Sequence, residues 1–223
     1  MTRKPSLLIF DVNETLLDMQ PLKKEINEEL GSQLAFNSWF CRLLLFSSVE
    51  TLTGEYRDFG EIGAAVLKMT AKEFSAEISE ERIKEILGKI TDLDPHPEVP
   101  EALEELRKGC FKLVALTNGG KDTVNKQLKT AKLEGYFDAI YSVEAVGKFK
   151  PHPETYHHVL KKENSKPDDS MLIAAHAWDI TGAQRAGLQT AFIHRPGKFL
   201  YPLAQEPEIT GKDLKEIIPY LNG

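Results

Sequence analysis

The chain has 223 residues, of which 41% are hydrophobic and 28% are charged, and its formal net charge at pH 7 is −6. This composition is typical of a globular protein with a sizeable core and excludes a disordered chain. The longest apolar runs, such as Leu7–Phe10 and Leu43–Phe46, are far shorter than the roughly 18 residues of a membrane span, so no membrane partner is expected. The chain is acidic and has no basic stripe, so nucleic acid is not expected as its main partner.

The cysteines and the first residues bear on the compartment. Cys41 and Cys110 have neither the spacing of metal ligands nor that of a disulfide framework. Arg3 and Lys4 precede a short apolar run, but Asp11 interrupts it and no small-residue cleavage site follows, so no signal peptide is predicted. We therefore expect a cytoplasmic protein.

Short apolar runs without alternation predict the strands of a parallel sheet that is buried on both faces. These runs are Ser6–Val12, Phe111–Thr117, Ala139–Val143, Met171–Ala175 and Thr190–His194. Helical patterns stand between them, at Glu98–Lys108, Lys121–Leu133, Pro153–Lys162 and Asp179–Ala186. The alternation of strand and helix predicts an open α/β sheet.

Residues 19–94 break this alternation, because no strand candidate stands out there. Apolar residues recur at helical spacing from Phe36 to Ser47, and Ile62–Ala76 and Glu80–Ile90 also predict helices. The segment Asp94–Pro97 is a stiff connector back to the sheet. The sequence therefore predicts an α/β core made of residues 1–18 and 95–223, with a helical insert over residues 19–94.

In such a sheet, ligands bind beyond the carboxyl ends of the strands, so the residues at those ends are the candidate site. They are Asp11 and Thr15, Thr117 and Asn118, Lys150, and His176 and Asp179. Each alone has an ordinary structural interpretation, as a helix cap, a turn residue, a solvated lysine or a buried histidine. Their joint occurrence at four strand ends favours an active site.

In this order, Asp11 with Thr15, Thr117-Asn118, Lys150 and Asp179 resemble the four motifs of the haloacid dehalogenase (HAD) superfamily. The resemblance covers essentially the whole chain, and the helical insert resembles the type 1 cap of that superfamily. It implies a Rossmann-like α/β core with a parallel sheet and an inserted helical cap.

Two positions bear on the branch of the superfamily. Its phosphatases carry a second aspartate two residues after the nucleophile, which protonates the leaving alkoxide, and Asn13 stands there. They also keep an aspartate as a magnesium ligand four residues before the position of Asp179, and Ala175 stands there. Magnesium prefers oxygen ligands, so these differences argue against a phosphatase of small phosphate esters, which is the alternative function.

The other motifs resemble the type II, L-2-haloacid dehalogenases, which need no metal. Lys150-Pro151 is followed by Tyr156 six residues after the lysine, and Ala177-Trp178-Asp179 by Gly182-Ala183. The resemblance implies a hydrolase that converts short L-2-haloalkanoic acids to 2-hydroxy acids with no cofactor and no metal. A carboxylate displaces the halide and forms an ester, which water then cleaves. The leaving halide needs no proton, and a lysine can supply the positive charge of a metal.

The resemblance implies a role for each catalytic position. Asp11 is the nucleophile, with Thr15 as a supporting residue. Lys150 holds the Asp11 carboxylate, and Tyr156 supports the lysine. Asp179 positions or activates the water that cleaves the ester.

Other positions are expected to bind the substrate. Thr117 matches a serine that binds the substrate carboxylate, and Asn118 matches a residue near the departing halide. Trp178 matches a residue of the pocket wall, for which simple packing is the alternative. Many dehalogenases place a halide-binding arginine at the position of Cys41; here Arg42 follows it, and faces either the site or water.

Three positions depart from the dehalogenase pattern. Glu14 replaces a glycine of the first motif, and Ala174 and His176 replace a serine and an asparagine of the fourth. An ordinary histidine pKa of about 6.5 suits a general base at neutral pH. His176 lies three residues before Asp179, so we expect it to activate the hydrolytic water, the alternative being a hydrogen-bonding wall.

A further alternative is a non-catalytic binding domain on the same scaffold, against which the intact Asp11, Lys150 and Asp179 argue. The expected partner is a small-molecule haloacid. Relatives of this type are often homodimers, but the sequence does not decide the oligomeric state.

Overall fold

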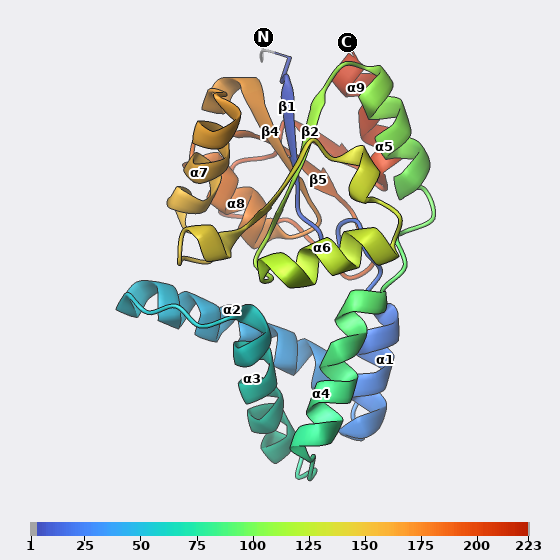
Figure 1. Cartoon of the computed structure of the whole chain (residues 1–223), viewed down its shortest axis with the longest axis vertical. Coiled ribbons are helices and arrows are strands. Elements are labelled where there is room, and N and C mark those ends of the chain that lie inside the picture. Colours follow the sequence, from blue (N-terminus) through green and yellow to red (C-terminus); the bar gives the residue numbers. More distant parts are fainter. Residues whose placement is uncertain (1–3, 223) are drawn as a thin grey trace.

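The computed structural model describes residues 4–222, in which six strands form one entirely parallel sheet (Figure 1). The strands are β1 (Leu7–Phe10), β2 (Lys112–Thr117), β3 (Ala139–Ser142), β4 (Ser170–Ala174), β5 (Gln189–Ile193) and β6 (Ile209–Gly211). Their order is β3-β2-β1-β4-β5-β6. β1, β4 and β5 are buried along their whole length, which explains their apolar runs without alternation.

Helices cover both faces of the sheet. They are α5 (Val99–Lys108), α6 (Lys121–Thr130), α7 (Pro153–Glu163), α8 (Ala177–Arg185) and α9 (Leu214–Asn222), with short 3-10 turns η2 (Glu134–Tyr136), η3 (Val143–Ala145) and η4 (Pro167–Asp169). α7 and α8 lie on one side of the sheet, and α5 and α9 lie on the other (Figure 1). The strand order reverses between β1 and β4, which is the point where sheets of this kind bind ligands.

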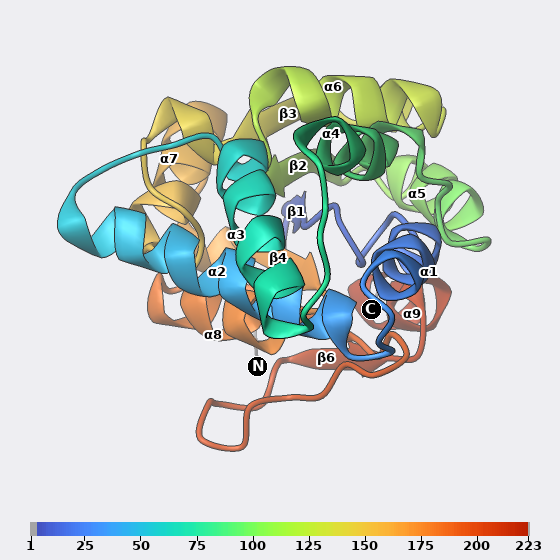
Figure 2. The same cartoon turned by 90° about the horizontal axis from the view of Figure 1, so that it is seen from below.

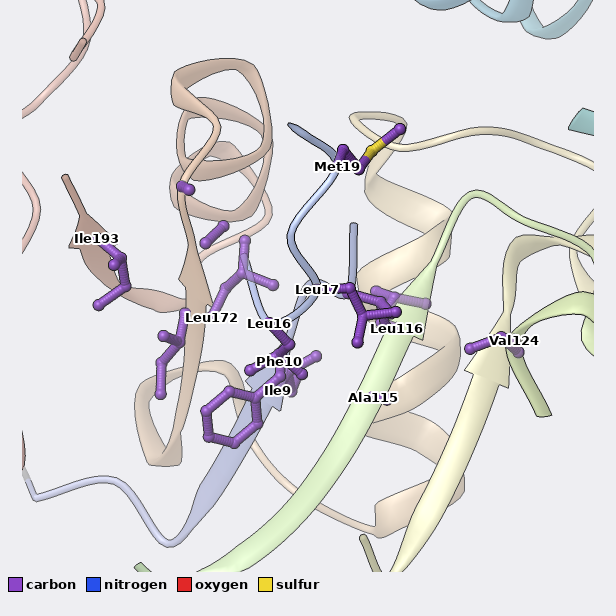
Figure 3. Close-up of a cluster of buried hydrophobic side chains, with 14 of the residues drawn as sticks. Ile9, Phe10, Leu16, Leu17, Met19, Ala115, Leu116, Val124, Leu172 and Ile193 are labelled. Carbon is purple, nitrogen blue, oxygen red and sulfur yellow. The ribbon is translucent and has the colours of Figure 1, made fainter. Parts of the chain in front are cut away.

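The loop that follows β1 is held in the hydrophobic core. The side chains of Leu16 and Leu17 are fully buried, and they lie beside residues of the central strands (Figure 3). Burial of each such side chain stabilises the fold by about 1.5–3 kcal/mol. In addition, the guanidinium of Arg195 donates two hydrogen bonds to the carbonyl oxygen of Thr15, at 2.8 and 3.2 Å. The segment after β1 is therefore held both by its buried leucines and by the Arg195 hydrogen bonds.

The segment between β1 and α5 forms a helical cap below the carboxyl ends of the strands (Figure 1). It contains α1 (Gln20–Glu29), α2 (Ala35–Thr53), α3 (Phe59–Glu73), α4 (Glu80–Gly88) and the 3-10 turn η1 (Lys89–Asp92). Seen from below, α2 and α3 lie in front of the region of β4, and β1 is visible beside α3 (Figure 2). The predicted α/β core with an inserted helical cap after the first strand is confirmed.

The two chain crossings between core and cap run side by side. The backbone N–H of Asp18 donates to the carbonyl oxygen of Asp94 at 2.9 Å, and that of His96 donates to Leu16 at 2.9 Å. Within the cap, the indole N–H of Trp39 in α2 donates to the carbonyl oxygen of Gly63 in α3 at 2.9 Å. Among residues 4–222, no helix has the length and apolar character that a membrane span needs.

Candidate active site

Asp11 follows β1 directly, and its side chain is almost completely buried. Its backbone N–H continues the sheet ladder by donating to Ile173 at 3.1 Å. The hydroxyl of Thr15 donates to Asp11 Oδ2 at 2.6 Å and accepts the N–H of Ala175 at 2.9 Å. Thr15 therefore links the Asp11 carboxylate, just after β1, to the end of β4.

Lys150 lies between two carboxylates and is fully buried. Its Nζ donates to Asp11 Oδ1 at 2.9 Å, to Asp179 Oδ2 at 2.6 Å and to the carbonyl oxygen of Leu116 at 3.0 Å. An ammonium group has three N–H donors, so all of them are used within the site. One fixed positive charge thus serves both carboxylates.

Tyr156 and Gly182 set the position of Asp179 in the first turn of α8. The Tyr156 hydroxyl donates to Asp179 Oδ1 at 2.5 Å. A Cβ at Gly182 would lie 2.4 Å from the Cβ of Pro151 and 2.6 Å from the Tyr156 hydroxyl. Only glycine therefore lets α8 approach α7 closely enough for this hydrogen bond.

The pKa shifts of the buried charges follow from these contacts. Burial alone would raise the pKa of Asp11, but Lys150, His176 and the Thr15 hydrogen bond outweigh it and hold that pKa below its ordinary value. Burial alone would lower the pKa of Lys150, but the two carboxylates raise it. Burial raises the pKa of Asp179. At neutral pH, Asp11 is therefore an ionised carboxylate beside a charged lysine.

His176 contacts two aromatic rings and lies beside Asp11. Its ring stacks on Phe40 of α2 at a centroid distance of 5.6 Å and on Trp178 at 5.3 Å. Its Nε2 lies 4.0 Å from Asp11 Oδ2 and 3.4 Å from Glu14 Oε2. Burial lowers the pKa of His176 more than the two carboxylates raise it, so the imidazole is neutral at pH 7 and able to accept a proton.

Glu14 and Lys198 belong to the site, although the sequence assigned them no role in it. Glu14 has a φ of 62°, in the left-handed region that favours glycine, which explains the glycine of the dehalogenase pattern at this position. Its Oε2 accepts a hydrogen bond from Lys198 Nζ at 2.5 Å, and this Nζ lies 5.5 Å from the centre of the Phe40 ring. Lys198 lies in the loop after β5, far along the chain from any motif, so no sequence signal identifies it.

A small pocket of about 20 Å³, here called the nucleophile pocket, opens beside Asp11. The predicted site residues that line it are Asp11, Thr117, Asn118, His176 and Trp178, and the cap adds Phe40, Leu44 and Phe59. Asn118 also holds Lys150, because its Oδ1 accepts the backbone N–H of the lysine at 2.9 Å. The indole N–H of Trp178 is buried and has no hydrogen-bond partner within residues 4–222, so it is an unused donor in the pocket wall.

Arg42 does not line this pocket, which corrects the expectation that it binds the substrate. Its Nη1 donates to Glu73 Oε2 at 2.5 Å, to the Ser38 hydroxyl at 2.6 Å and to the Thr70 hydroxyl at 3.3 Å. The acidic partner on α3 therefore holds the guanidinium within the cap, away from Asp11. The Arg42 side chain is partly exposed and is bonded to other residues of the cap.

The position where the phosphatases keep a metal ligand supplies no side-chain oxygen. Ala175 takes part only through its backbone N–H, which donates to Thr15. No group of three or more His, Cys, Asp or Glu side chains within residues 4–222 is placed to hold a metal ion. The positive charge beside Asp11 in this arrangement is that of Lys150.

The fold and the site together define a class of α/β protein in which a carboxylate follows the first strand and a helical cap is inserted after it. A family model described as haloacid dehalogenase-like hydrolase matches residues 8–193, and the chain belongs to this family.

Named relatives agree with this assignment. The chain is 26% identical to haloacetate dehalogenase H-2 of Moraxella sp. (strain B), over 93% of this chain and 94% of the relative. It is also 26% identical to (S)-2-haloacid dehalogenase 4A of Burkholderia cepacia, over 85% and 83% of the two chains. The L-2-haloacid dehalogenase of Xanthobacter autotrophicus with chloropropionic acid covalently bound has the same fold, with a TM-score of 0.90, 22% identity, and 98% and 99% coverage. The predicted resemblance to L-2-haloacid dehalogenases is confirmed.

Proposed function

We propose that this hydrolase removes halide from short L-2-haloalkanoic acids and gives 2-hydroxy acids through an ester between Asp11 and the substrate. The observation that carries the proposal is the buried Lys150 ammonium, which lies within hydrogen-bond distance of both Asp11 and Asp179. The similarity to haloacetate and (S)-2-haloacid dehalogenases supports the same reaction.

In the first step, Asp11 attacks the carbon that bears the halogen, and the halide leaves with the bonding electron pair. The lowered pKa of Asp11 keeps the nucleophile ionised at neutral pH. A carboxylate fixed beside the bound substrate can reach an effective molarity of about 10⁵–10⁸ M. Thr117, Asn118 and the unused N–H of Trp178 line the space that the substrate carboxylate and the halide would occupy.

In the second step, water attacks the carbonyl carbon of the Asp11 ester and releases the 2-hydroxy acid. The neutral His176, 4.0 Å from Asp11 Oδ2, accepts the proton of this water. The Thr15 hydroxyl and the Lys150 ammonium already donate to the carboxylate oxygens of Asp11, so they stabilise the negative charge that develops there.

The site gives less support to a phosphatase. Such an enzyme needs an acid for the leaving alkoxide, and Asn13, at the corresponding position, accepts a hydrogen bond from Gln127 through its amide oxygen at 2.9 Å. An amide cannot supply an acid proton in that step.

The test is a halide-release screen with chloro-, bromo- and iodoacetate and with both 2-chloropropionate enantiomers, in the presence and absence of EDTA. We expect halide release that survives the chelator, favours the L-enantiomer and is lost in Asp11→Asn. In a single turnover in ¹⁸O-water, the new hydroxyl should carry unlabelled oxygen from Asp11. Label in that hydroxyl would exclude the ester, and magnesium-dependent cleavage of p-nitrophenyl phosphate without halide release would favour the phosphatase.

A further inference from the structure

A larger cavity, here called the cap–core cavity, adjoins the nucleophile pocket. Its volume is about 260 Å³, against about 20 Å³ for the nucleophile pocket. Its walls come from α2, α3 and the end of α4 in the cap and from α6 and the segment before it in the core. The two spaces share Asn13, Phe40 and Phe59, so they lie next to each other.

The lining of the cap–core cavity selects apolar groups. It includes Trp39, Leu43, Phe59, Leu87 and Ile90, and no charged residue within the described part of the chain contributes to it. Several polar groups at the wall are already hydrogen-bonded within the protein. The Trp39 indole N–H donates to the carbonyl oxygen of Gly63, and Gln127 Nε2 donates to Asn13 Oδ1 and to the carbonyl oxygen of Ile90, both at 2.9 Å. The bonded groups leave a wall that is mainly apolar.

The cap–core cavity, at about 260 Å³, is large enough to hold a sizeable apolar group. An apolar protein cavity of about 150 Å³ binds benzene. The cap–core cavity therefore has room for an aromatic ring or for an alkyl chain of several carbons.

Gly63 keeps this cavity open. It lies in the interior of α3, where glycine is less favourable than alanine. A Cβ at Gly63 would lie 3.7 Å from Trp39 Cζ2 and 3.9 Å from Leu87 Cδ1, which are ordinary van der Waals distances, and its φ is not in the left-handed region. Neither the backbone nor close packing requires glycine here. A side chain at this position would extend toward the residues that line the cavity.

We propose that the cap–core cavity is a subsite for the apolar tail of the substrate. The preferred substrates are then 2-haloalkanoic acids with an alkyl or aryl group of roughly four or more carbons on the carbon that bears the halogen. The carboxylate and the reacting carbon occupy the nucleophile pocket, and the tail extends past Phe40 and Phe59 into the larger cavity. This inference rests on the proposed function and extends its substrate class beyond short acids.

The first experiment compares kcat/KM for halide release from L-2-bromopropanoate, L-2-bromobutanoate, L-2-bromohexanoate and L-2-bromooctanoate. Each methylene that enters an apolar site should raise kcat/KM about fourfold, so the hexanoate should exceed the propanoate by roughly 60-fold. A value of kcat/KM that is flat or falls from propanoate to hexanoate would overturn the inference.

The second experiment fills the cavity. In Gly63→Leu, the ratio of kcat/KM for hexanoate to that for propanoate should fall at least about tenfold, because the new side chain occupies the space of the tail. Gly63→Ala is the milder variant, with a smaller fall and a helix that is at least as stable. The matched control is Ala65→Leu, which adds a leucine to the exposed face of the same helix and should leave the ratio unchanged.

Both substrates are measured on the same preparation, so a loss of folded protein cancels in the ratio. An unchanged ratio in Gly63→Leu and Gly63→Ala would mean that the tail does not lie in this cavity. Halide release from haloacetate and L-2-bromopropanoate, without a higher kcat/KM for the longer 2-bromo acids, would refute this inference alone. No halide release from any of these acids would refute the proposed function itself.

Discussion

Replacement of Lys150 by methionine should destabilise the protein as well as inactivate it. Methionine keeps most of the length of the side chain but removes the charge that lies 2.9 Å from Asp11 and 2.6 Å from Asp179. Breaking a buried ion pair by removing one partner costs about 3–5 kcal/mol, which is a large part of the roughly 5–15 kcal/mol that stabilises a folded domain. For a chain of this size, the melting temperature should fall by roughly 6–20 °C.

The loss of stability should depend on pH in a defined direction. In the wild-type protein, Lys150 helps to hold the pKa of Asp11 low, so its contribution is present at neutral pH and is lost as pH falls through that low pKa. In Lys150→Met, no cation stays between the two carboxylates, so the pKa of Asp11 rises above its unfolded value and the already raised pKa of Asp179 rises further. The free energy of unfolding of the variant is then reduced at neutral pH, and it recovers on acidification as the buried carboxylate takes up a proton. Its difference in melting temperature from wild type should narrow from about pH 8 to about pH 5.

Thermal denaturation followed by circular dichroism measures both effects. The double variant Lys150→Met/Asp179→Asn should regain part of the lost stability, because it removes one uncompensated buried charge, while halide release stays absent. Lys148→Met is the control, since Lys148 forms a partly exposed ion pair with Glu154, and its melting temperature should stay within about 2 °C of wild type. If Lys150→Met melts like wild type at neutral pH, or if the difference does not change with pH, the reasoning about a shared buried charge is wrong.

Three further variants test other parts of the site. His176→Ala should release about one halide per Asp11 and then slow by about 10²–10⁴-fold, with the esterified Asp11 visible as a mass increase; near-normal turnover in His176→Asn would instead make the histidine a hydrogen-bonding wall. Glu14→Gln should lower the pKa of His176 further, because it removes a carboxylate 3.4 Å away, and should move the acid limb of the pH–rate profile to lower pH; an unmoved limb would exclude His176 as the titrating base. Arg42→Ala should change kcat/KM less than about twofold, because its ion pair with Glu73 lies within the cap; a large rise in KM for haloacids would show that Arg42 reaches the substrate.

The strands of the core could be predicted because full burial leaves a distinct pattern of uninterrupted apolar residues. β6 and α9 were not predicted, for identifiable reasons. β6 has three residues with an exposed centre, so it forms no apolar run. α9 contains Pro219, which ordinarily argues against the interior of a helix.

The candidate site was predictable to the extent that strand ends determine it. Asp11, Lys150 and Asp179 come together because parallel strands end at the same edge of the sheet. Lys198 reaches the site through the path of a loop, which no local pattern encodes. The position of Arg42 depends on Glu73, which lies on another helix, so spacing along α2 alone could not decide it.

The side-by-side crossings between core and cap make the cap an interchangeable module. Asp18 and Asp94 are hydrogen-bonded neighbours, so both ends of the insert leave the core at the same place, as the two ends of a short loop would. The entropic cost of closing such an insert grows only slowly with its length. Asp11, Lys150 and Asp179 all come from the core, whereas Gly63, Trp39 and Leu87 come from the cap. Evolution, or an engineer, can therefore graft a different cap between these two crossings and direct the same chemistry to a different molecule without rebuilding the chemistry itself.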